Sequence, residues 1–367
     1  MNPVKTAVIG CGAISDIYLT NMIEKYSTLK VVACCARHRE NAEKKAAQFG
    51  IRPASTDEIL ADPEVELIVI LTPPSTHYDL VRKALLAGKH VYTEKPFALK
   101  LEQAEELLAL AEEKGLLLGS APETFLGSAI QTGRKALDEG KIGEITGFHV
   151  VGNRNISILA GLYKYMRQPG GGICYDYGVY YLTALVSLLG SMKEVYAKVG
   201  NFRRERKNTV TISPEYGQYY IYDNEAQVNA ILTTESGVIG TFSLNGDSSA
   251  IDQGYFTIHG TKGILRLGDA DLFGTEVSYM PEDYFSGSWQ TLEPVSDLSD
   301  NCRGLGVAQL ARCIREGGEP LVSGRMACHV LDIVEKIMES GKNGQAYYTE
   351  TVCERPAPFD NWKELLK

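Results

Sequence analysis

Apolar and polar positions follow a repeating order along the first 120 residues of the chain. Short, continuously apolar segments are typical of buried parallel strands, and they occur near 5–10, 30–35, 67–71, 89–93 and 116–120. Segments with the spacing of an amphipathic helix lie between several of them, at 13–26, 38–49, 77–87 and 100–114. Strands that alternate with helices predict an α/β domain with a doubly wound parallel sheet over residues 1–121.

The pattern changes after residue 121. Two helices are predicted at 126–139 and 178–189, and a later pair at 304–316 and 323–340. The segment 203–224, which contains several arginines and tyrosines, is predicted to be a long loop. Apolar segments separated by turn signals predict antiparallel strands, at 145–151, 194–202, 226–234, 237–245, 254–259 and 263–267. We therefore expect residues 122–367 to form an α+β domain with a large, mostly antiparallel open sheet and helices on one face.

Composition narrows the classes of function. The net charge of −9 disfavours non-specific binding to nucleic acid or to an anionic membrane surface. We find no signal-peptide pattern at the N-terminus and no apolar run near the ~18 residues that a membrane helix needs. The eight cysteines include no C-x-x-C pair and no cluster with zinc-like spacing, so we expect a cytoplasmic protein without a metal site.

The first predicted strand runs into a glycine-containing turn, Gly10-Cys11-Gly12-Ala13-Ile14-Ser15, that opens the first helix. Gly10 suits the tight turn, and Gly12 lets the backbone approach a pyrophosphate. The helix start at Ala13 and Ile14 offers N–H groups to the anion. A strand, this turn and a helix form the context of a dinucleotide fingerprint, so we predict a Rossmann domain that binds NAD or NADP. The alternative is a simple turn that needs glycine only for packing.

The end of the second predicted strand bears on the choice of cofactor. NAD enzymes usually place a carboxylate there for the ribose 2′-hydroxyl, whereas this chain has Ala36 followed by Arg37, His38 and Arg39. Without that carboxylate a 2′-phosphate meets no repulsion, and Arg37 is placed to pair with it. We therefore predict NADP over NAD. The alternative is that these cations are solvated charges at a helix start and that NAD binds.

Three further motifs make a family resemblance specific. Thr72-Pro73-Pro74-Ser75-Thr76-His77 follows the third predicted strand, Thr93-Glu94-Lys95-Pro96 follows the fourth, and Gly170-Gly171-Gly172 leads into Asp176-Tyr177-Gly178-Val179-Tyr180. Together with the glycine turn, they make the chain resemble the Gfo/Idh/MocA family of glucose–fructose oxidoreductase, inositol dehydrogenase and rhizopine-catabolism proteins over essentially its whole length. Many members have histidine where this chain has Tyr180. The tyrosine is similar to the branch that contains glucose–fructose oxidoreductase and dimeric dihydrodiol dehydrogenase.

The resemblance implies a set of site residues. Lys95, Asp176 and Tyr180 would be catalytic, and the cofactor contacts beside the glycine turn would be Thr72, Pro73, His77, Glu94 and Lys95. Oxidising a secondary alcohol requires a hydride acceptor, which is the nicotinamide, and a base for the hydroxyl proton. We assign the base to Tyr180, with Lys95 as the cation that favours the tyrosinate, and we expect Asp176 to orient Lys95 or a substrate hydroxyl. The alternatives are a core or interface role for Tyr180 and helix capping for Asp176.

The candidate substrate contacts are Glu123, where the chain leaves the first domain, and Arg154, Tyr163 and Arg167, which precede the triple glycine. For each of the last three, an exposed loop residue is the alternative. We expect hydride transfer between a nicotinamide and a secondary hydroxyl of a sugar, polyol or glycoside, with ring C-3 as the candidate carbon. A glycoside-cleaving lyase or hydrolase that uses bound NAD transiently is the runner-up, and a cofactor-binding regulator the third hypothesis. The resemblance also implies a homo-oligomer, a dimer or larger, formed through the open face of the second domain's sheet.

Overall fold

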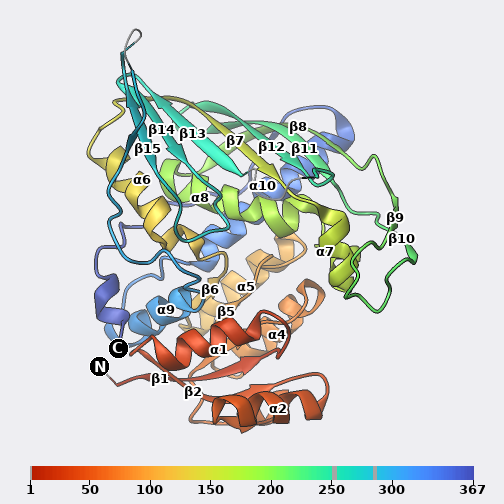
Figure 1. Cartoon of the computed structure of the whole chain (residues 1–367). Coiled ribbons are helices and arrows are strands. Elements are labelled where there is room, and N and C mark those ends of the chain that lie inside the picture. The colour runs from red at the N-terminus through yellow and green to blue at the C-terminus, as the bar shows by residue number, and fades with distance from the viewer. Residues whose placement is uncertain (1, 250–253, 284–286) are drawn as a thin grey trace. The chain divides into compact units, whose positions relative to one another are not determined.

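The computed structural model describes residues 2–249, 254–283 and 287–367 of the chain (Figure 1). The chain forms two compact units. Unit 1 comprises Met1–Glu123, Asn301–Cys328 and Phe359–Lys367, and unit 2 comprises Thr124–Asp300 and His329–Pro358.

Unit 1 is built on a six-stranded parallel sheet with the strand order β3-β2-β1-β4-β5-β6. Its central strand β4 is completely buried, which is why its sequence, Leu-Ile-Val-Ile, is apolar at every position. The strand order reverses between β1 and β4, as in a doubly wound fold, so the predicted parallel sheet is confirmed. The strands are β1 (Val4–Ile9), β2 (Leu29–Cys35), β3 (Arg52–Pro53), β4 (Leu67–Ile70), β5 (His90–Thr93) and β6 (Leu118–Ser120).

The helices of unit 1 follow its strands. Right-handed crossovers on either side of a reversed strand order leave from opposite faces, so α1 covers one face of the sheet and α4 and α5 the other. The short helix α3 escaped the sequence analysis although Ser55 and Glu58 form a reciprocal cap at its start. These helices are α1 (Ser15–Glu24), α2 (Arg39–Phe49), α3 (Thr56–Ala61), η1 (Pro74–Thr76), α4 (His77–Leu86), α5 (Leu101–Lys114) and α9 (Leu305–Glu316), with η5 (Trp362–Leu365) near the C-terminus.

The return of the chain to unit 1 corrects our domain assignment, which gave the whole of 122–367 to the second domain. Helix α9 contacts α1, β1 and β6, and its buried face includes Leu305, Ala308 and Leu310. Arg315, in the last turn of α9, holds both carboxylate oxygens of Glu66 at 2.7 Å. The apolar face of α9 is visible in the sequence, but the surface that it covers depends on contacts nearly three hundred residues away in the chain.

Unit 2 contains a nine-stranded sheet in the order β16-β15-β14-β13-β7-β12-β11-β8-β17. Among the described strand pairs of this sheet, only β12 and β7 pair in parallel, so the expectation of a large, mostly antiparallel sheet is confirmed. Figure 1 shows α6 and α8 against one face. On the other face, side chains such as Ile231 are 48% exposed. The strands are β7 (Ile145–Asn153), β8 (Met192–Gly200), β11 (Gln227–Thr234), β12 (Ile239–Asn245), β13 (Tyr255–Gly260), β14 (Gly263–Leu267), β15 (Ser278–Pro281), β16 (Gln290–Thr291) and β17 (Tyr347–Tyr348).

Helices α6, α8 and α10 lie close to the predicted ranges, whereas α7 and η3 were not predicted. Helix α10 starts in unit 1 and continues into unit 2, because the chain passes between the units after Cys328. These helices are η2 (Thr124–Leu126), α6 (Ser128–Asp138), α7 (Ile156–Leu162), η3 (Lys164–Arg167), η4 (Cys174–Gly178), α8 (Val179–Leu189) and α10 (Gly324–Asn343).

The predicted long loop at 203–224 is instead an ordered arm. It contains a two-stranded antiparallel sheet of β9 (Glu205–Lys207) and β10 (Tyr219–Ile221). Arg206 of this arm is buried, with its guanidinium bonded to Asp247 at 2.6 Å and to Ser157 at 2.8 Å. The prediction was wrong because each strand is only three residues long, too short to show an alternating pattern.

Candidate active site

The glycine turn after β1 has the geometry that a dinucleotide requires. Gly10 has φ = 113°, and a Cβ there would lie 2.7 Å from the Leu71 carbonyl group, so only glycine fits. A Cβ on Gly12 would meet no atom within 4 Å, which leaves its backbone open to a ligand. Helix α1 then begins without a side-chain cap at Ile14, and Ala13 is exposed. These residues fit a pyrophosphate held at the helix N-terminus.

The end of β2 carries no carboxylate. Cys35 ends the strand, Ala36 is half-buried, and Arg37 is exposed. Arg39 is engaged with Glu43 at 3.1 Å and Glu58 at 3.8 Å, whereas Arg37 forms no ion pair with any residue that the structure describes. Arg37 is therefore available to a phosphate on the adenosine ribose.

The loops that follow β4 and β5 are joined through His77. Its buried imidazole places Nδ1 2.8 Å from the Pro96 carbonyl oxygen and Nε2 2.8 Å from the Thr72 carbonyl oxygen. Burial lowers the pKa of His77, whereas the two backbone carbonyl oxygens raise it. Thr76 donates from its hydroxyl to the Pro73 carbonyl at 2.8 Å and so tightens the same loop. We predicted that His77 contacts the cofactor; with both ring nitrogens at backbone carbonyls, it instead holds the two loops together.

Glu94 and Lys95 follow β5 directly, at the carboxyl edge of the sheet beside the glycine turn. The Glu94 carboxylate accepts a hydrogen bond from the Tyr18 hydroxyl at 2.7 Å and another from the Lys95 backbone N–H at 3.1 Å. Tyr18 lies on α1 and is fully buried. The sequence analysis missed Tyr18, although a tyrosine on the apolar face of a helix needs a partner for its hydroxyl.

Glu123, the candidate substrate contact where the chain leaves the first domain, is buried. It is 1% exposed, and its carboxylate accepts hydrogen bonds from the backbone N–H groups of Gly304, at 2.7 Å, and Gly306. It therefore caps the N-terminus of α9 from a distant part of the chain. Burial raises the pKa of Glu123 to about 7. This residue stabilises unit 1 and is closed to a substrate.

In unit 2, Asp176 and Tyr180 lie where a turn of π-helix, η4, runs into α8. The neighbouring tyrosines face an internal carboxylate: Asp269 accepts from Tyr177 at 3.0 Å and from Tyr181 at 2.8 Å. Burial raises the pKa of both phenols, and it also raises that of Tyr175. Three of the four tyrosines in this segment are thus poor bases, and the assignment of the base to Tyr180 stays a prediction.

The last of the three glycines before this helix, Gly172, is needed because the Glu225 carboxylate packs against it. A Cβ on Gly172 would lie 2.0 Å from Oε1 of Glu225, and that oxygen accepts a hydrogen bond from the Cys174 N–H at 3.0 Å. Gly170 has φ = 86°, which favours glycine for a second reason. Glu225 therefore caps the helix that carries Asp176 and Tyr180, a role that the sequence analysis did not assign.

Glu225 gives the protein an expected pH dependence of stability. Burial raises its pKa from 4.5 to about 7, so the folded state binds this proton more tightly than the unfolded state. Between those values the folded state holds more protons, and the free energy of unfolding must fall as pH rises. We expect Glu225→Gln to remove about 3 kcal/mol of this fall, measured by urea unfolding at pH 5 and pH 8.

Glu215 supplies the matched control. Hydrogen bonds from Lys164 and Arg167 lower its pKa, so its contribution to stability is lost as pH falls, and Glu215→Gln should change the pH dependence in the opposite sense. A Glu225→Gln variant with the same pH dependence as the wild type would contradict this account.

The three predicted substrate residues of unit 2 have different surroundings. Arg154 bonds Asp271 at 2.6 Å and lies 4.0 Å above the Tyr177 ring, so it belongs to the cluster that supports α8. Arg167 bonds Glu215 at 2.8 Å and stacks on Tyr220 at 3.9 Å. These contacts connect Arg167 to the arm, and its role as a substrate contact stays a prediction. Tyr163 is 39% exposed beside Tyr165 and stays a candidate.

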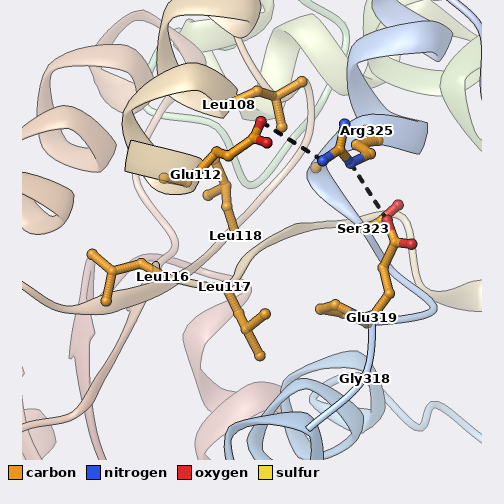
Figure 2. A pocket seen from close by; sticks show the side chains of 12 residues that line it. Leu108, Glu112, Leu116, Leu117, Leu118, Gly318, Glu319, Ser323 and Arg325 are labelled. Atoms are coloured by element: carbon orange, nitrogen blue, oxygen red, sulfur yellow. Dashed lines mark ion pairs between the residues drawn. The ribbon is translucent and has the colours of Figure 1, made fainter. Parts of the chain in front are cut away.

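A cavity of about 270 Å³ lies elsewhere in unit 1. It is lined by the last turns of α5, by Leu116 and Leu117 before β6, and by the start of α10. Figure 2 shows Arg325 between Glu112 and Glu319, with closest N···O distances of 3.8 and 3.7 Å. Because Leu116 and Leu117 precede β6, this cavity lies at the amino end of that strand, opposite the edge where α/β sheets bind nucleotides.

The described residues contain neither a candidate metal cluster nor a candidate membrane helix. Within residues 2–249, 254–283 and 287–367, His, Cys, Asp and Glu side chains form no group of three or more that could hold a metal ion. Over the same residues, every helix is too short or too polar to cross a membrane.

Comparison with known proteins shows the family of the chain. Residues 4–121 match the model of an oxidoreductase family with an NAD-binding Rossmann fold. Residues 130–266 match the C-terminal domain model of the same family. The chain belongs to the Gfo/Idh/MocA family of oxidoreductases and has the family's NAD(P)-binding domain.

Three similar proteins illustrate the relationship. The dTDP-3,4-didehydro-2,6-dideoxy-alpha-D-glucose 3-reductase of Actinomadura kijaniata is 31% identical, over 76% of this chain and 78% of that protein. The scyllo-inositol 2-dehydrogenase (NADP(+)) IolW of Bacillus subtilis is 26% identical, over 95% and 97%. A levoglucosan dehydrogenase solved with NADH, at 19% identity, superimposes with a TM-score of 0.83 over 95% of this chain and 100% of that one, which shows a common fold. Two other curated oxidoreductases are matched over only 55% and 56% of their length.

Proposed function

We propose that this protein transfers a hydride between NADP and a secondary hydroxyl of a sugar, polyol or glycoside. The observation that carries the proposal is the position of Lys95, directly after β5 at the sheet edge that holds the glycine turn. A lysine there reaches the place where open α/β sheets bind the reactive end of a nucleotide ligand. The named activities of the Actinomadura and Bacillus relatives, on a sugar nucleotide and an inositol, support this substrate class.

The nicotinamide supplies the hydride chemistry when it is bound. The chain's own residues manage the proton: Tyr180 takes it from the substrate hydroxyl, and Lys95 stabilises the negative charge that develops on the oxygen. Asp176 orients Lys95 or a second substrate hydroxyl. We place the reaction at ring C-3 of the substrate, in keeping with the 3-reductase name of the Actinomadura relative.

A panel of free sugars, polyols and glycosides tests the function. Each is incubated with the protein and NADP or NAD, and the absorbance of the reduced cofactor is followed. Steady accumulation with a polyhydroxylated substrate is the expected result. Cleavage of a glycoside without net reduction of the cofactor would contradict the dehydrogenase and favour the elimination mechanism.

The choice of NADP depends on Arg37. This exposed cation is the one we assign to the 2′-phosphate, and the name of the Bacillus relative, which specifies NADP(+), agrees with it. We expect Arg37→Ala to weaken NADP binding by roughly ten- to a hundredfold, the effect of losing a charged hydrogen bond, and to leave NAD binding nearly unchanged. Titration of both cofactors against intrinsic fluorescence measures this. Arg39→Ala, which removes a cation already paired with Glu43, is the control.

If wild-type protein binds NAD more tightly than NADP, the assignment of Arg37 is wrong.

We also propose that the protein works in the cytoplasm as a homo-oligomer assembled through the open face of the unit 2 sheet. Light scattering that gives the mass of a single chain, 40.2 kDa, would contradict that assembly.

A further inference from the structure

The Tyr18 hydroxyl is one of the best-enclosed polar groups of unit 1. Tyr18 is 0% exposed and lies on α1, three residues after the helix begins at Ser15. Its hydroxyl donates to Oε1 of Glu94 at 2.7 Å. Burial raises the pKa of Tyr18, so the phenol keeps its proton and acts as a donor over the whole working range.

Glu94 connects Tyr18 to Lys95 through its second carboxylate oxygen. Its second oxygen, Oε2, accepts the backbone N–H of Lys95 at 3.1 Å, while its own backbone N–H donates to the Ile70 carbonyl at 2.8 Å. The carboxylate is thus held from two sides, once by α1 and once by the loop that carries the lysine. A half-buried carboxylate that loses one donor becomes free to rotate toward water, and the second bond weakens with it.

We propose that Tyr18 is a positioning residue for Lys95, acting through the Glu94 carboxylate. The chain Tyr18–Glu94–Lys95 joins the helix whose N-terminus would hold the pyrophosphate to the loop of the lysine assigned to the reaction. The buried hydrogen bond between Tyr18 and Glu94 thereby fixes the position of the Lys95 loop relative to the N-terminus of α1. The expected effect on kcat rests on the proposed function of Lys95. The contact between Tyr18, Glu94 and the Lys95 backbone can be tested without measuring turnover.

Tyr18→Phe is the first test, because it removes one oxygen and leaves the buried ring. We expect faster hydrogen exchange of the Lys95 amide, followed by mass spectrometry of peptides that cover residues 93–97. We also expect kcat to fall by roughly ten- to a hundredfold, with the dissociation constant for the cofactor changed less than threefold. Tyr26→Phe is the control: Tyr26 is equally buried, and its hydroxyl donates to the Cys302 carbonyl at 2.6 Å, away from Glu94.

A double-mutant cycle separates positioning from general loss of stability. If Tyr18 acts through Glu94, the kcat of the Tyr18→Phe/Glu94→Gln double variant should be close to the kcat of the less active single variant. Both substitutions interrupt the same series of hydrogen bonds, so the second one adds little. Independent effects would multiply instead. Unchanged Lys95 exchange in Tyr18→Phe, an equal rise in Tyr26→Phe, or multiplying effects on kcat would each overturn the proposal. If Lys95 amide exchange rises in Tyr18→Phe as expected but the wild type turns over no substrate, the proposed function is wrong while the contact between Tyr18 and Glu94 is still supported.

Discussion

Replacing Lys95 with methionine should lower kcat by roughly 10²- to 10⁴-fold while cofactor binding stays within a fewfold of the wild type. Methionine keeps most of the length of the side chain but removes the ammonium. Without that cation, the charge that develops on the reacting oxygen is uncompensated, so we expect the loss to fall on the chemical step. Steady-state rates and fluorescence titration of the cofactor separate the two effects.

Lys89 is the matched control for this substitution. It precedes β5 as Lys95 follows it, and its ammonium donates to the carbonyls of Asp62 at 2.6 Å and Val65 at 2.8 Å. Lys89→Met should therefore cost stability and leave kcat largely intact at temperatures well below unfolding. Full turnover in Lys95→Met, or an equal loss in both variants, would remove Lys95 from the mechanism.

The parts of the site that depend on local geometry were readable in the sequence. Gly10 has to be glycine because of its positive φ, a constraint that follows from a tight turn between a strand and a helix. The place of Lys95 follows equally well, since residues that come directly after parallel strands gather at one edge of the sheet. Local rules sufficed for these residues because the constraint comes from their immediate neighbours in the chain.

Residues whose role depends on distant packing could not be predicted in this way. Glu123 looked like a cleft residue, yet its partners Gly304 and Gly306 lie 181 and 183 residues away. Arg167 was expected in the substrate pocket but is held by Glu215 in an arm whose strands are too short to be recognised. Nothing near either residue in the chain indicates these partners. The same reason explains why α9 was assigned to the wrong unit.

Tyr180→Phe should lower kcat by roughly 10²- to 10³-fold and remove the dependence of kcat on pH that a titrating base produces. The ring is kept, so substrate and cofactor should bind nearly as before. Tyr180→His is the informative companion, because the family resemblance implies histidine as an alternative base at this position. It should recover part of the lost rate, with its optimum moved toward lower pH, since free histidine titrates near pH 6.5 and tyrosine near pH 10.

Tyr181→Phe is the control, one residue further along α8. Its hydroxyl bonds Asp269 at 2.8 Å, and burial raises its pKa, so we expect lower stability without loss of the pH-dependent step. The pH profile of kcat measured for all three variants decides between the roles. If Tyr180→Phe keeps the pH dependence and rate of the wild type while Tyr181→Phe loses them, the base has been assigned to the wrong face of the helix.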